Sequence, residues 1–163
     1  MLDRTTGSSA QHLGAAAAQG FSSNPAQPEV ARTFQALLTV GYLVAAADEL
    51  AAGERAALSG VLERAAGSVV DRAMFDQRLA EIEALRTSLG ADEAMRRAAA
   101  DLSGPFARRE AIVFAALVSI GDGSLSVQEV EALARLGEHV QVPRGEVFAL
   151  IEDVVHSVTK ALG

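Results

Sequence analysis

Apolar residues recur at the spacing of α-helices along most of the chain from residue 28 onward. Two segments, 36–47 and 109–120, are almost wholly apolar, which indicates helices that are buried at the centre of the protein. The valine-rich stretches fall within helical patterns, so we expect no strand. The pattern predicts helices over 28–47, 52–66, 70–88, 92–102, 105–120, 127–139 and 143–162.

Proline and glycine mark the ends of these segments. Pro28, Pro105 and Pro143 suit the first position of a helix, where the missing N–H group has no partner to lose. Gly90 follows a predicted helix and suits its C-terminal cap. We therefore predict an all-α fold, a helical bundle of about seven helices in one domain over 28–163.

Residues 1–27 differ in composition from the rest of the chain. Ser, Gly, Gln, Asn, Ala and Pro dominate, and such a segment buries too little apolar surface to offset its ordering entropy. We predict a flexible N-terminal tail. The alternative is a docking peptide that folds on a partner.

The clearest helix-turn-helix signal lies between residues 120 and 129. Gly121-Asp122-Gly123 ends the apolar run with residues that tolerate a left-handed backbone. Ser126 and Glu129 then have the spacing of a capping box, in which each side chain accepts from the other residue's main-chain amide. A helix is predicted to begin here.

Two interpretations of the acidic groups at this turn remain open. In the first, they only cap the helix and complement its dipole. In the second, Asp122 and Glu129 help to hold a divalent cation, because the spacing matches the second half of an EF-hand loop. The two earlier ligand positions fall on Val118 and Ile120, so a true EF-hand site is not expected.

Two parts of the chain repeat one order of features, an apolar helix, an acidic turn, a helix with an early glutamate and an amphipathic helix. We predict an internal duplication, with repeats over about 28–89 and 105–163. Similar composition in both halves is the alternative explanation. Two such halves would pack about a pseudo-twofold axis. The aligned residues include Leu43 with Leu117, Asp48 with Asp122, Leu50 with Leu125, Glu54 with Glu129 and Leu58 with Leu133.

The stretch Gly121-Asp122-Gly123-Ser124-Leu125-Ser126-Val127-Gln128-Glu129, after an apolar helix, resembles the TerB-like domain of tellurite-resistance proteins. A weaker copy is Ala47-Asp48-Glu49-Leu50-Ala51-Ala52-Gly53-Glu54, which lacks the glycine after Asp48 and the serine cap. The resemblance covers residues 28–162. It implies an all-helical fold with pseudo-symmetry, a link to tellurite or chemical stress, and metal binding through clustered acidic residues.

On this resemblance the expected metal ligands are Asp48, Glu54, Asp122 and Glu129. Clustered carboxylates suit hard cations, so calcium, magnesium or manganese would be the ion. The departure of the first copy from the family pattern weakens the case for a symmetric pair of sites. The alternative is two solvated acidic turns that never meet.

Charge and composition narrow the partners. The formal net charge of −7 disfavours nucleic acid as a partner, since nucleic-acid binding needs a basic face, and favours cations, basic segments or neutral proteins.

The longest apolar run, 36–47, is interrupted by Thr39 and Gly41 and is shorter than the roughly 20 residues that cross a bilayer. The N-terminal residues lack the pattern of a secretory signal, and no cysteine is present. A cytoplasmic protein without a transmembrane segment is predicted.

No catalytic motif stands out, and we predict that the protein is not an enzyme. His139 and His156 lack further ligands at zinc-site spacing, so each is expected to be structural or exposed. Arg96 and Arg97 adjoin acidic residues and are expected to be paired at the surface. The leading hypothesis is a non-enzymatic TerB-like module that scaffolds protein partners, with a weak divalent-cation site. A metal-responsive sensor is the alternative, and homo-oligomerisation stays open.

Overall fold

The computed structural model describes residues 28–48, 72–102, 104–120 and 124–162. The predicted tail over 1–27, the predicted helix over 52–66 and the turn at 121–123 lie outside these ranges. Within them the protein is all-helical and has no strand, which confirms the predicted class. Its elements are α2 (Pro28–Ala45), the 3-10 turn η1 (Ala46–Asp48), α4 (Arg72–Leu89), α5 (Ala91–Ala100), α6 (Pro105–Ser119), α7 (Val127–His139) and α8 (Arg144–Leu162).

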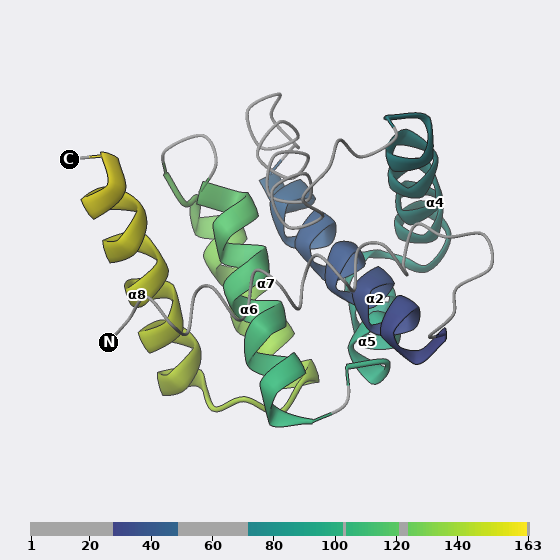
Figure 1. Ribbon diagram of the computed structural model, residues 1–163. Coiled ribbons are helices and arrows are strands. Elements are labelled where there is room, and N and C mark those ends of the chain that lie inside the picture. Colours follow the sequence, from purple (N-terminus) through teal and green to yellow (C-terminus); the bar gives the residue numbers. More distant parts are fainter. Residues whose placement is uncertain (1–27, 49–71, 103, 121–123, 163) are drawn as a thin grey trace.

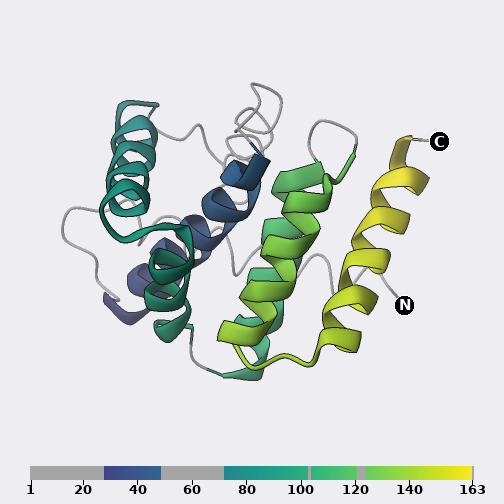
Figure 2. The same cartoon turned by 180° about the vertical axis from the view of Figure 1, so that it is seen from behind.

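The two apolar helices form the centre of the bundle, as the sequence predicts. Helix α2 packs against α6 more extensively than any other two elements in the described ranges. The outer helices α4 and α8 lie on opposite sides of this pair (Figure 1). Seen from behind, α5 lies over α2 and α7 lies over α6 (Figure 2). Helix α5 contacts α2, and α7 contacts α6.

The core is built mainly from small and branched aliphatic side chains. The second half of α6 is its most deeply buried part, because seven of the nine residues from Ala111 to Ser119 are buried, which agrees with the apolar composition of this stretch. The largest side chains that are almost wholly buried are Phe34, Leu38, Leu43, Leu79, Leu102, Ile112, Leu133 and Leu136. Removing this apolar surface from water is the main force that holds the bundle together.

A glycine allows the central helices to approach closely. A Cβ atom added at Gly41 of α2 would lie 2.6 Å from Cε1 of Phe114 on α6. Phe114 is itself buried, so its ring has little room to move. Gly41 therefore fits a contact in which one backbone lies directly against an aromatic ring.

The breaks between helices mostly fall where the sequence places them. Gly90 links α4 to α5 with φ at 85°, a left-handed conformation that favours glycine, and its amide donates to the carbonyl of Arg86 at 2.9 Å. Pro143 differs slightly, because α8 begins one residue later. Its carbonyl accepts from the amide of Val147 at 3.0 Å, so Pro143 precedes the helix instead of opening it.

Candidate functional site

Helix α7 begins with the predicted serine cap. The amide of Glu129 donates to Oγ of Ser126 at 3.1 Å, which confirms one half of the capping box. The second half, a bond from the Ser126 amide to the Glu129 carboxylate, stays a prediction. The side chain of Glu129 is only 2% exposed, so it lies in the interior and does not extend into solvent as an ordinary capping residue would.

The burial of Glu129 follows from its position on the helix. Leu133 and Leu136 lie on the same inward stripe of α7, the C-cap residue Val140 continues it, and all three are buried. A carboxylate at the first position of such a stripe enters the core together with the apolar residues below it. Burial of a carboxylate is costly unless polar groups compensate, so this position is under stronger structural constraint than a surface cap.

The element that carries Asp48 contacts the helix that carries Glu129. The turn η1, whose last residue is Asp48, packs against α7. The side chains of Asp48, Glu54 and Asp122 fall outside the described part, so only Glu129 of the four expected ligands has a known surrounding. Among the side chains that the structure does describe, no three His, Asp or Glu residues are grouped closely enough to hold a metal ion. The four-residue cation site stays a prediction.

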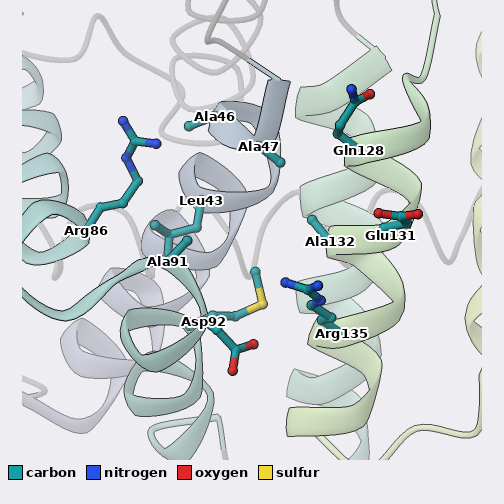
Figure 3. A pocket seen from close by; sticks show the side chains of 11 residues that line it. Leu43, Ala46, Ala47, Arg86, Ala91, Asp92, Gln128, Glu131, Ala132 and Arg135 are labelled. Carbon is teal, nitrogen blue, oxygen red and sulfur yellow. The ribbon is translucent and has the colours of Figure 1, made fainter.

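A pocket of about 280 Å³ lies between η1, the α4–α5 junction, α5 and α7 (Figure 3). We call it the α5–α7 pocket. Its floor is formed by buried apolar residues of α2 and α5, and its rim by charged and amide groups. The lining residues are Leu43, Ala46, Ala47, Arg86, Ala91, Asp92, Met95, Gln128, Glu131, Ala132 and Arg135.

One wall of the α5–α7 pocket is fixed by a hydrogen-bonded group on α4. Arg86 donates from two nitrogens to the carboxylate of Glu83, at 2.6 and 3.0 Å. The hydroxyl of Tyr42 also donates to that carboxylate, at 2.8 Å, and ties α4 to α2. The hydrogen bond from Arg86, followed by the one from Tyr42, lowers the pKa of Glu83, so this group is charged at neutral pH.

On the opposite wall of the pocket, the guanidinium of Arg135 is not bound to a carboxylate of the described residues as Arg86 is bound to Glu83. Arg135 of α7 is exposed and forms no ion pair with any residue in the described ranges. Its side chain is directed from α7 towards α5 (Figure 3). At the rim, Asp92 lies 3.0 Å from Nε2 of His139, which links the first turn of α5 to the last turn of α7. Arg135 and Glu131 thus give the rim charges of both signs.

The predicted surface ion pairs of Arg96 and Arg97 are present on the outer face of α5. Glu93 accepts two bonds from Arg96, at 2.6 and 2.8 Å, and one from Arg97 at 3.2 Å. These bonds, led by the one from Arg96, lower the pKa of Glu93 to about 2. His139 likewise has a structural partner, the Asp92 carboxylate, as expected for an isolated histidine.

The α5–α7 pocket could not be predicted from the sequence, because its lining comes from four separate segments of the chain. Comparison of the chain with protein-family models, with curated proteins and with solved structures finds no match. None of the helices in the described ranges combines the length and the apolar character needed to cross a membrane.

Proposed function

We propose that the protein is a non-enzymatic interaction module, and that the α5–α7 pocket is where it receives a partner protein. The observation that carries the proposal is the combination of an apolar floor, built from residues such as Leu43 and Met95, with a rim of charged side chains. Hot spots of protein interfaces have this form, since a partner side chain fills the pocket while polar groups around it exclude water.

The charges around the pocket favour one kind of partner segment. Glu131 and Arg135 place one negative and one positive side chain on adjacent turns of α7. Arg86 is already hydrogen-bonded to the carboxylate of Glu83. A polyanion would meet the acidic groups of a chain with net charge −7. The pocket therefore suits a segment with one apolar side chain flanked by groups of both signs.

The proposal includes a TerB-like ancestry and an internal duplication, with a role in tellurite or chemical stress as the family resemblance implies. Two features of the fold support the duplication. Helices α2 and α6, which correspond in the two repeats, pack against each other at the centre. Helices α4 and α8, the third helices of the repeats, flank the bundle on opposite sides (Figure 1). The seventh helix, over 52–66, stays part of this proposal.

The experiment is quantitative co-purification from the producing cells, with wild type compared to pocket and control variants. Gln128→Arg and Arg135→Glu change exposed side chains at the rim, whereas Arg144→Glu makes the same charge reversal at the start of α8. We expect a partner that is retained by wild type and by Arg144→Glu and is lost from both pocket variants. Equal retention by all four proteins would contradict the proposal.

A cation sensor is the second candidate function, and one observation favours it. The turn that ends at Asp48 packs on α7, the helix in whose first turn Glu129 is buried. Calcium, magnesium or manganese is the expected ion, since carboxylate oxygens are the ligands these cations prefer.

Thermal unfolding after chelation, and again with each metal added, tests this second candidate. A ligand that binds only the native state raises its midpoint, so a sensor predicts a metal-dependent rise. The rise should disappear in Asp48→Asn and Asp122→Asn. Midpoints that do not respond to any of the metals would remove the sensor from consideration and leave the acidic residues as helix caps.

A further inference from the structure

A second groove lies on the other side of α5, between α2, α4 and α5. Its volume is about 210 Å³, and we call it the α2–α4 groove. Buried alanines, Ala36, Ala94 and Ala98, line its inner side. Leu85 and Leu89 line it from α4, and Leu85 is 45% exposed, so the groove presents aliphatic surface to solvent.

The charges at this groove are opposite to those of the chain as a whole. Arg32 of α2 and Arg97 of α5 line it, with Asp101 as the acidic member of the lining. Arg32 forms no ion pair within the ranges that the structure describes. Arg97 has one bond of 3.2 Å to Glu93, whose stronger bonds go to Arg96. A protein with net charge −7 thus presents two accessible guanidinium groups beside exposed leucine surface.

We propose that the α2–α4 groove docks an acidic segment of a partner protein. An apolar side chain of that segment packs on Leu85 and Leu89 over the alanine floor. Carboxylates on either side of it pair with Arg32 and Arg97, since planar guanidinium groups bind carboxylates with two parallel hydrogen bonds.

Each part of the groove contributes separately to this choice of partner. A free phosphate or another small anion would leave the leucine surface exposed to water. A purely apolar segment would give Arg32 no counter-charge and would add nothing to the 3.2 Å pair that Arg97 forms with Glu93. A segment that carries acidic groups beside an aliphatic side chain satisfies both parts, and rim charges of this kind act mainly on partner selection and association rate.

The test is selection of peptides from a random library displayed on phage, with the full chain as the target. Arg32→Glu/Arg97→Glu is the test variant, and Arg144→Glu/Lys160→Glu on α8 is a control with the same change in net charge. All four side chains are exposed, so folding of both variants is expected and is checked by circular dichroism. Selected peptides are then titrated against each protein, and their contacts are mapped by NMR on the wild type.

We expect enrichment of peptides that combine Asp or Glu with Leu, Ile or Phe. Their affinity should fall at least about tenfold on the test variant, stay unchanged on the control, and weaken with added salt. Leu85→Ser should also weaken binding, and shifts should centre on the amides of Leu85 and Leu89.

Three results would overturn the proposal. The library could yield no acidic enrichment, or the selected peptides could bind the charge-reversed variant as well as the wild type. Sedimentation could instead show a dimer of the chain that the test variant abolishes and the control keeps, which would assign the groove to a second copy.

Discussion

The contact between Gly41 and Phe114 allows the packing of the central helices to be tested directly. In Gly41→Ala the new methyl group would lie 2.6 Å from Cε1 and 2.9 Å from Cδ1 of the Phe114 ring. Cβ atoms in real proteins essentially never approach this closely, so the ring or the helices must shift. Because Phe114 is buried against neighbouring core residues, the shift disturbs the α2–α6 interface.

The expected magnitude is the balance of two opposing effects. Alanine favours the helix over glycine by about 0.8–1 kcal/mol. Overpacking of a well-filled core costs about 1–3 kcal/mol. We place the cost in the upper part of that range because the methyl group meets a ring that is itself buried among core residues. Gly41→Ala should then lower the free energy of unfolding by about 1–2 kcal/mol, and Tm by about 2–8 °C.

Chemical denaturation and thermal unfolding measure this change, and the chain offers a matched control. A Cβ atom at Gly145, in the first turn of α8, would have no neighbour within 4 Å. Gly145→Ala should therefore raise the stability by about 0.4–1 kcal/mol. In Gly41→Ala/Phe114→Leu, the smaller side chain should recover part of the loss, so the double variant should be more stable than additivity predicts. A Gly41→Ala protein as stable as wild type would refute the close helix approach.

Three further predictions concern single groups. Ser126→Ala removes the acceptor for the Glu129 amide and should cost about 1 kcal/mol of unfolding free energy, whereas Ser126→Asp should keep the cap. Tyr42→Phe removes the hydrogen bond to Glu83 at 2.8 Å; it should cost about 0.5–1.5 kcal/mol at neutral pH and should raise the pKa of Glu83 in an NMR titration. An NMR titration should also give Glu93 a pKa of about 2 instead of the ordinary 4.5, and in Arg96→Gln the value should rise. Because the folded-state pKa of Glu93 is the lower one, its contribution to stability is present above about pH 4.5 and disappears as the pH falls towards 2, a loss that Glu93→Gln should not show.

The helices were predictable because hydrophobic periodicity and end signals agree along the chain. Helix α7 begins after Ser126, whose side chain caps it, and α6 begins at Pro105, which suits a first helical position. Both signals can be recognised in the sequence itself. The burial of Glu129 was not predicted, because the capping pattern said nothing about which face of α7 turns inward. That face is decided by the packing of α7 against its neighbours.

The two pockets could not be predicted from the sequence, because helix packing brings their lining residues together. Arg86 and Arg135 reach one pocket from helices far apart in the chain, and their approach depends on how the bundle packs. The same holds for Arg32 and Arg97 in the α2–α4 groove. The acidic neighbours of Arg97 in the sequence predict its pairing at the surface, but its position beside the exposed Leu85 depends on how α5 packs against α4.

Site-specific photo-crosslinking in the producing cells tests the interaction function most directly. A photoreactive residue replaces Gln128 at the rim of the α5–α7 pocket or, as a control, the exposed Glu152 on α8. We expect a discrete adduct with a partner protein from position 128, its loss when Arg135→Glu is added, and no such adduct from position 152. The absence of an adduct from position 128, or the same adduct from both positions, would contradict the proposed interaction function.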